Sequence, residues 1–463
     1  MCQYSLDYEL AQTYDHKSGA LKNVLRNQMR RIIEDESHSS LWKTNELLRK
    51  NTDFLIELID EKLLIKNDIL TQDLFDISSN ISDALEAEKH VEQIFILKSP
   101  LSNAMSIGEG SLVITTGLLS GLDNIGELTF VLAHEFAHYE LGHTVQSARY
   151  RGGQRKWNTS LRNFMNNEIT LKDFERLKDQ IYQYAELKRE SEIQADSIAI
   201  EALIALNFNH INGINALKRL DSSFVTPFNS DELFEELRRI GPFWNEQWIV
   251  SGNKSSFKGG RSVFAEDSVA THLSIRNRIT DISTKYGEAT GIKSSETDNF
   301  LTWEFKDQMR FESADGAFST KNYDLALFKA LELKCIYPNN RFVTALIVKI
   351  LIEVHRIKNT YSNEILGYLI PQPSSDYTEQ LRNVNTFIKR IQTAELAEFL
   401  YLYLNRKEVF DSSYEEHYYL LWKLADITDR QKAKKSIREV YLTKFEEPIY
   451  KSEMSSLISK KNK

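Results

Sequence analysis

The sequence predicts an α+β protein that is mostly α-helical, with a small β-sheet between helical N- and C-terminal regions. Its 463 residues include only 7 prolines and 18 glycines, which favours helices joined by short connections. Most of the chain alternates apolar and charged positions at helical spacing. Two stretches, residues 90–99 and 111–119, are instead short, apolar and β-branched, as strands are.

A chain of this length exceeds what one hydrophobic core usually supports, so several domains are expected. The sequence indicates three regions, which are a helical segment over 1–70, a central domain over 71–288 and a helical domain over 289–463. The last region holds one stretch spaced like a tetratricopeptide repeat, ADGAFSTKNYDLALFKALELKCIYPNN. A single unit leaves open whether this region forms a repeat array.

Charge, apolar runs and cysteine content narrow the expected partners and cellular location of the protein. A net charge of −8 gives no electrostatic reason to expect nucleic acid as a partner. The N-terminus lacks a basic segment followed by an apolar one, and the most apolar run, 342–354, is too short to cross a bilayer. Cys2 and Cys335 provide no disulfide framework and no cysteine zinc site. We therefore expect a cytoplasmic protein without a transmembrane segment.

The central domain is expected to begin with two strands, joined by turn residues in SNAMSIGEG. Strand 111–119 is either an edge strand, which an extended peptide can join, or an ordinary core strand. Asp123 or Asn124 is expected to cap the helix that follows. The basic cluster over 149–156 is expected in a solvated loop, and a second loop-rich span, 220–262, has no predicted role.

The capped helix carries the stretch TFVLAHEFAHYELGHTV, which places histidines and glutamates among apolar residues. His134 and His138 are four positions apart, so on a helix they lie one turn apart on one face and can bind one tetrahedral zinc ion. Glu135 lies beside such a metal, where a carboxylate can take a proton from water and pass it to the leaving amine. The alternative is a chance HExxH whose histidines are satisfied by backbone carbonyls.

The third ligand decides the class of site. The HExxHxxGxxH arrangement requires Gly at 141 and His at 144, but those positions are Leu141 and Thr144. The downstream stretch ESEIQADSIAIEA offers Glu192 and Asp196, four positions apart on one helix face. We expect Glu192 to bind zinc and Asp196 to accept a hydrogen bond from the far ring nitrogen of a ligand histidine. The alternative is an exposed charged face.

Four separated stretches resemble, in order, the signatures of peptidase family M48, the zinc endopeptidases that include HtpX-like and CaaX prenyl-protein proteases. They are SNAMSIGEGSLVITTGLL, LAHEFAHYELGH, ESEIQAD and ATHLSIRNRI. The resemblance covers about residues 70–285 and includes a histidine five positions after the second ligand, His143. Leu273 departs from the pattern, because the family usually has proline there. The resemblance implies a zincin-like metalloprotease core of the gluzincin type.

By this resemblance, His134, His138 and Glu192 are the ligands of one zinc ion per chain, and Glu135 is the general base. The membrane-spanning helices of several family members are not seen in this sequence, so a membrane substrate is not implied.

Asn103 and His272 are implied to steady the oxyanion of the tetrahedral intermediate. Their alternatives are a turn residue and a loop-packing residue. Arg278 is implied to orient carboxylates around the site, with Asp196 as a candidate.

The favoured hypothesis is a zinc endopeptidase that cleaves extended or unfolded polypeptides. The alternative is a latent or inactive protease fold that binds protein partners through its C-terminal helices. In a latent state, His143, His272 or a carboxylate from 220–262 would cap the zinc. A chance HExxH would predict no bound metal.

Overall fold

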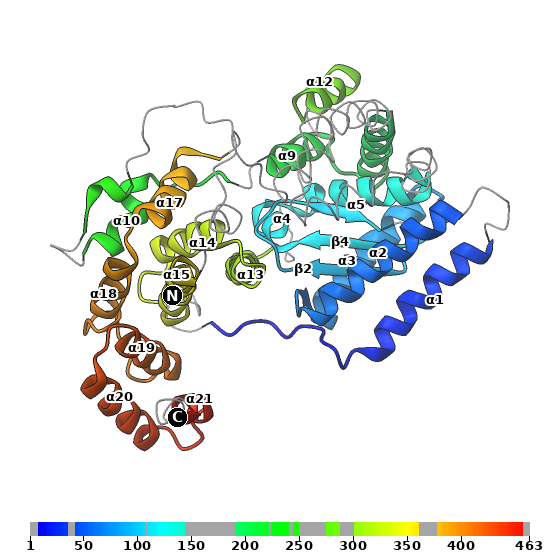
Figure 1. Ribbon diagram of the computed structural model, residues 1–463. Coiled ribbons are helices and arrows are strands. Elements are labelled where there is room, and N and C mark those ends of the chain that lie inside the picture. The colour runs from blue at the N-terminus through cyan, green and yellow to red at the C-terminus, as the bar shows by residue number, and fades with distance from the viewer. Residues whose placement is uncertain are drawn as a thin grey trace, which may run out of the picture. The chain divides into compact units, whose positions relative to one another are not determined.

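The computed structural model of the protein describes residues 8–35, 42–107, 110–143, 190–221, 224–239, 244–249, 275–287, 301–360 and 377–456. The chain divides into two units (Figure 1). The sheet unit comprises residues 11–223 and 264–309, and the helical unit comprises residues 1–10, 224–263 and 310–463. The chain therefore passes from one unit to the other four times, at positions 10, 223, 263 and 309.

The described part of the sheet unit contains one four-stranded sheet, in the order β1-β2-β4-β3. The strands are β1 (Leu64–Ile65), β2 (Gln93–Leu97), β3 (Ala104–Ser106) and β4 (Ser111–Thr115). Strands β2 and β4 are parallel, while β1 pairs antiparallel with β2, and β3 pairs antiparallel with β4. A small sheet among many helices confirms the predicted α+β, mostly α-helical class.

Three details of the sheet differ from the prediction. The strand expected over 111–119 ends at Thr115, because the Thr115 hydroxyl accepts a hydrogen bond from the Leu118 N–H and caps helix α4 (Thr116–Gly121). Residues 104–106, expected in a turn, form β3 by pairing with the free side of β4. Strand β4 therefore lies between β2 and β3, so of the two alternatives for this strand the edge position is wrong, and β3 is the outer strand on this side of the sheet.

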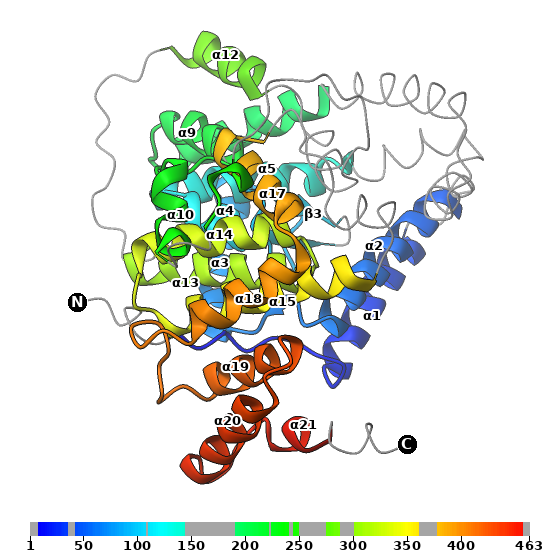
Figure 2. The ribbon, with the colours of Figure 1, turned by 60° about the vertical axis from the view of Figure 1, so that its left-hand side comes forward.

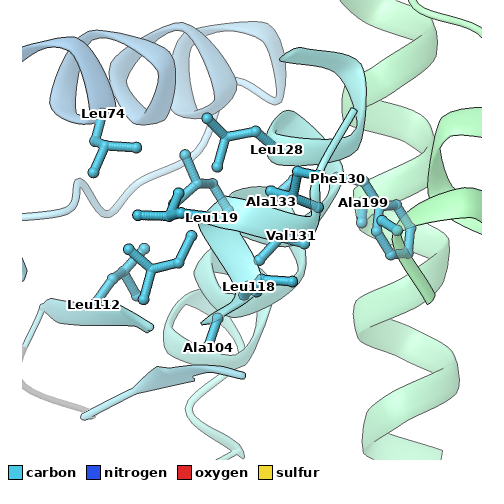
Figure 3. Close-up of a cluster of buried hydrophobic side chains, with 14 of the residues drawn as sticks. Leu74, Ala104, Leu112, Leu118, Leu119, Leu128, Phe130, Val131, Ala133 and Ala199 are labelled. Carbon is cyan, nitrogen blue, oxygen red and sulfur yellow. The ribbon is translucent and has the colours of Figure 1, made fainter. Parts of the chain in front are cut away.

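Apolar residues cover both faces of the sheet, which explains why β2 and β4 read as continuous apolar runs. Ile94 and Leu112 belong to a core shared with helices α3 (Asp68–Ala84) and α5 (Ile125–Glu140). Figure 3 shows Leu112 of this core with Leu74 of α3 and Leu128 of α5.

The alternate residues of the same strands face the other way. Phe95 and Val113 pack with residues of helices α1 (Gly19–Asp35) and α2 (Trp42–Asp60). The N-terminal helices therefore cover one face of the sheet and belong to the sheet unit.

Helix α5 begins where the sequence predicts. The Asn124 side chain accepts a hydrogen bond from the Glu127 N–H at 3.0 Å, as an N-cap residue does. At the other end, Lys89 Nζ donates to the carbonyl oxygens of Tyr139 and Glu140 at 3.0 and 2.7 Å, respectively. Both ends of this buried helix are therefore fixed by side chains.

The described sheet unit also contains three further helical segments and the first residues of α13. They are residues 190–205, α9 (Ile211–Leu220) and α12 (Ile275–Tyr286). In the segment 190–205, Ala195 and Ala199 are completely buried, and Ala199 lies beside Phe130 of α5 (Figure 3). These small side chains let the segment approach the histidine helix closely, as the sequence predicts.

The helical unit is built mainly from consecutive helices. They are α10 (Ser230–Arg238), α13 (Trp303–Ser319, which begins in the sheet unit), α14 (Tyr323–Ile336), α15 (Arg341–Thr360), α17 (Glu379–Arg390), α18 (Thr393–Leu404), α19 (Glu415–Ile427), α20 (Gln431–Lys444) and α21 (Lys451–Ser456). Helix α14 packs against α15, α18 against α19, and α19 against α20. Figure 2 shows α18, α19 and α20 following one another. In the predicted repeat, Ala314 and Ala326 are both fully buried.

Within the span without a predicted role, the described residues 224–239 and 244–249 fold with the helical unit. Its two helical elements are α10 and the 3₁₀ turn η3 (Glu246–Trp248). The Trp244 ring stacks on Phe387 of α17 with centroids 5.8 Å apart, and Trp248 meets Phe399 of α18 edge-on at 6.2 Å. These aromatic contacts anchor the span to the C-terminal helices.

The division into regions 1–70, 71–288 and 289–463 remains a prediction about where independently folding domains begin and end. None of the helices in the described ranges is long and apolar enough to cross a lipid bilayer.

A buried histidine in the helical unit predicts a pH-dependent stability. His417 in α19 is fully buried, its Nδ1 accepts from the Asp411 N–H, and its Nε2 donates to the Arg341 carbonyl oxygen. Burial lowers the pKa of His417 from 6.5 to about 4. The unfolded chain therefore gains this proton first as the pH falls, so stability is complete above pH 6.5 and is lost toward pH 4.

By this reasoning, the wild-type protein should lose about 3 kcal/mol more unfolding free energy than His417→Gln between pH 7 and pH 4. Chemical denaturation at both pH values measures the difference. Equal losses in the two proteins would contradict a neutral buried imidazole.

Candidate metal centre

Helix α5 and the helical segment 190–205 bring the three predicted metal ligands together. His134 and His138 lie one turn apart on α5, and Glu192 lies in the first turn described of the other segment. The His134 Nε2 and His138 Nε2 atoms are 3.1 Å apart. The Glu192 oxygens Oε2 and Oε1 lie 3.4 Å from His134 Nε2 and 3.5 Å from His138 Nε2, respectively.

These distances fit a tetrahedral metal ion. Two ligand atoms at zinc–nitrogen bond lengths and a tetrahedral angle are about 3.4 Å apart. The three donor atoms form a group that could hold a metal ion, and His134 and Glu192 are each only 3% exposed. Two imidazoles and one carboxylate are also the donor set that zinc accepts.

Asp196 and Arg278 support this group from behind. Asp196 Oδ1 lies 3.0 Å from His134 Nδ1, the ring nitrogen that points away from the ligand cluster. Arg278 of α12 donates from Nε and Nη2 to the two Asp196 oxygens at 2.8 and 2.5 Å, and its Nη1 lies 3.0 Å from Glu192 Oε2. The guanidinium is buried, so it bridges two carboxylates that water does not reach.

The charges around His134 control its protonation. Burial and the Arg278 charge lower the pKa of His134, but hydrogen bonds to Asp196 and Glu192 outweigh them and raise it to about 9. Burial raises the pKa of Asp196, yet the charge and hydrogen bonds of Arg278 and His134 bring it below its usual value. Asp196 is therefore an ionised acceptor for the proton on Nδ1. The raised pKa of His134 means that Nε2 also carries a proton near neutral pH, so a metal ion that binds there would release this proton.

Glu135 is held by the outer strand of the sheet. Asn103 accepts a backbone hydrogen bond from the Thr115 N–H of β4, and the Ile107 N–H donates to the Ser111 carbonyl oxygen. In this antiparallel pairing the intervening residues Ala104 and Ser106 direct their polar backbone groups away from β4. One of these outward groups, the Ser106 N–H, donates to Glu135 Oε2 at 2.9 Å. Glu135 is 6% exposed and, with His134 and Ala104, lines a small pocket.

Of the two residues implied to stabilise an oxyanion, the structure describes Asn103 but not His272. The backbone of Asn103 is fixed beside Thr115, whose hydroxyl accepts from the Asn103 N–H at 3.0 Å and whose N–H donates to the Asn103 carbonyl. Asn103 is not among the residues that line the pocket. His272, Leu273 and the basic cluster 149–156 lie outside the described residues.

A second hydrogen-bonded chain reaches His138, the other histidine among the candidate ligands. His143 Nδ1 lies 3.0 Å from His138 Nδ1, and His143 Nε2 lies 3.1 Å from Gln194 Oε1. The sequence marks His143 as a feature of the resemblance and as a candidate to cap the zinc in a latent state, and it does not single out Gln194. The only local signal was the position of Gln194 between Glu192 and Asp196.

Comparison with known proteins finds similarity in the part of the chain that contains these residues. Residues 70–285 match the model of peptidase family M48. The chain is 31% identical over 93 residues to the Homo sapiens protein named metalloendopeptidase OMA1, mitochondrial, covering 18% of each chain. It is 28% identical over 101 residues to the Danio rerio protein of that name, covering 21% of each chain. The chain thus spans about a fifth of the length of these curated relatives.

The matched segment contains every site residue assigned above, from Asn103 to Arg278. Peptidases of this family depend on a metal ion, and the described residues bring together a donor set for one. Residues 70–285, just under half of the chain, therefore carry the sequence pattern of peptidase family M48.

Proposed function

We propose that this protein is a zinc-dependent endopeptidase that hydrolyses peptide bonds in extended or unfolded polypeptides. The observation that carries the proposal is the meeting of three donor atoms from His134, His138 and Glu192, with the Glu135 carboxylate beside them. These three residues would hold one zinc ion per chain. When bound, zinc polarises a carbonyl group and lowers the pKa of a water molecule.

Glu135 would act as the general base. Its carboxylate takes a proton from the attacking water and delivers it to the nitrogen of the leaving amine. The hydrogen bond from the Ser106 N–H orients this carboxylate and ties it to β3. Burial of the side chain limits competing water around the base.

Asp196 and Arg278 would position the ligands. Asp196 holds the proton on the far nitrogen of His134, and Arg278 keeps Asp196 and Glu192 from repelling each other in a buried site. Asn103 and His272 remain the proposed donors to the oxyanion of the tetrahedral intermediate.

The outer strand supports an extended substrate. The outward backbone groups of Ala104 lie beside the pocket that Glu135 lines, so an extended peptide can pair with β3 there. Such pairing uses backbone groups of the substrate, which a folded helix or sheet has already satisfied. We therefore propose unfolded segments as substrates.

Removing the metal tests the proposal. We expect one zinc ion per chain, cleavage of a permanently unfolded protein, loss of cleavage after dialysis against a chelator, and recovery when zinc is restored. The control is the native, folded form of the protein from which the unfolded substrate is prepared, and it should remain uncut. Undiminished cleavage by the metal-free protein would contradict a zinc peptidase.

A second candidate is a latent or inactive protease fold whose C-terminal helices bind a protein partner. The packing of consecutive helices α18, α19 and α20 favours it, because stacked helices of this kind often form binding surfaces. Stoichiometric zinc without cleavage of any unfolded substrate would favour this candidate.

The cytoplasmic location expected from the sequence remains a prediction.

A further inference from the structure

His138 is held from behind by uncharged groups, in contrast to His134. The hydrogen-bonded chain runs from His138 Nδ1 to His143 Nδ1 at 3.0 Å, and from His143 Nε2 to Gln194 Oε1 at 3.1 Å. His143 is 4% exposed, whereas Gln194 lies at the surface. All three residues come from the two helical segments that supply the metal ligands or from the turn after α5.

We propose that Gln194 and His143 form a tautomer relay that holds His138 in the form needed to bind the metal. This role makes both of them positioning residues, and it rests on the proposed zinc site. The ligand is a divalent cation of the zinc type at the donor atoms already described.

The direction of the relay follows from hydrogen-bonding chemistry. The Gln194 carbonyl oxygen can only accept, so the nitrogen that faces it, His143 Nε2, carries the hydrogen. In a neutral imidazole the other nitrogen is then an acceptor, so His143 Nδ1 accepts from His138 Nδ1–H. His138 Nε2 consequently carries no hydrogen and has a free lone pair. This atom faces His134 and Glu192.

The opposite direction does not support metal binding. If the amide group of Gln194 donated to His143 Nε2, then His143 Nδ1–H would donate to His138 and the His138 hydrogen would move to Nε2. That hydrogen would point at His134 Nε2, 3.1 Å away, where a metal ion would otherwise bind. Only one orientation of the Gln194 amide is therefore compatible with ligation.

The two ligand histidines thus have different partners, Asp196 for His134 and His143 for His138. His134 faces the Asp196 carboxylate, whose charge Arg278 balances. His138 faces a neutral imidazole, which fixes the tautomer without adding another buried negative charge that would need its own partner. The relay therefore orients the second ligand while leaving the charge of the centre unchanged.

Paired substitutions of the full-length chain test the relay. We expect His143→Leu to weaken zinc binding by about 10- to 100-fold, because it removes the acceptor for His138. His143→Asn, which keeps an acceptor, should bind zinc within a few-fold of the wild type. Competition with a chromogenic chelator measures zinc affinity, and the absorption spectrum of bound cobalt reports the ligand geometry independently of any cleavage.

Substitutions of Gln194, at the exposed end of the relay, separate an effect on zinc binding from an effect on folding. Gln194→Glu keeps an acceptor and should retain zinc affinity, whereas Gln194→Lys offers only donors and should weaken it. Denaturation of the metal-free proteins should show equal stability for the two Gln194 variants. Equal zinc affinities for the acceptor and non-acceptor variants at both positions would overturn the relay alone. A wild-type protein that binds no zinc would overturn the relay and the proposed function together.

Discussion

Replacing Glu135 by Gln is expected to reduce cleavage of an unfolded protein by about 10²- to 10⁴-fold while leaving zinc binding intact. The amide cannot accept the proton of the attacking water, so the chemical step loses its base. It retains an oxygen that can accept from the Ser106 N–H, so the local structure should persist. Initial rates of substrate cleavage, together with zinc content by elemental analysis, measure both effects.

Glu140→Gln is the matched control for this experiment. Glu140 lies on the same helix, and its Oε2 accepts from the Lys89 N–H away from the donor cluster. The amide can keep this bond, so cleavage should stay within about two-fold of the wild type. An active Glu135→Gln protein would refute the proposed base, and an equal loss in both variants would indicate damage to the helix instead.

Replacing Arg278 by Met is expected to lower the unfolding free energy of the metal-free protein by about 3–5 kcal/mol. The guanidinium is fully buried and pairs with both Asp196 and Glu192, so its loss leaves two carboxylates buried without their cation. Bound zinc supplies positive charge at Glu192, so saturating zinc should recover part of the loss. Chemical denaturation with chelator and with zinc measures the two states.

Arg276→Met provides the control, because this arginine is exposed on the same helix α12. Its substitution should change stability by less than about 0.5 kcal/mol in either condition. If Arg278→Met were equally destabilised with chelator and with zinc, the arginine would not be balancing the charge of the metal ligands.

The meeting of the three proposed metal ligands was predictable, because it follows largely from local spacing. The four-residue interval between His134 and His138 puts both rings on one helix face, whatever the rest of the fold does. Glu192 and Asp196 repeat that interval, and the buried Ala199 shows in the structure why their helix can come close. Residue types and intervals were sufficient for this part of the site.

The rest of the site depends on tertiary contacts that no interval encodes. Arg278 reaches Asp196 across 82 positions, and its predicted place came from a family resemblance rather than from periodicity. The position of Gln194 between Glu192 and Asp196 does not reveal its partner, because its contact with His143 depends on how two helical segments pack. The hydrogen bond from His134 to Asp196 was predictable, but the pKa of His134 was not, because it depends on the burial and the charges that this packing creates.

The fold shows the same division between local and tertiary signals. Apolar β-branched runs predicted β2 and β4, yet the end of β4 depends on whether Thr115 continues the strand or caps a helix. Strand β3 has a weak local signal and exists because β4 offers it a partner. The aromatic anchor at Trp244 was equally hidden, since its partner Phe387 lies far along the sequence.

The path of the chain between the two units limits how this protein could be shortened or recombined. The segment with Trp244 and Trp248 is flanked in sequence by α9 and α12 of the sheet unit, but its aromatic partners belong to α17 and α18. A truncated chain that ended at residue 288 would expose these tryptophans, and a fragment that began at 289 would lack them. The C-terminal helices are therefore not an interchangeable module, and neither half of the sequence carries a complete unit.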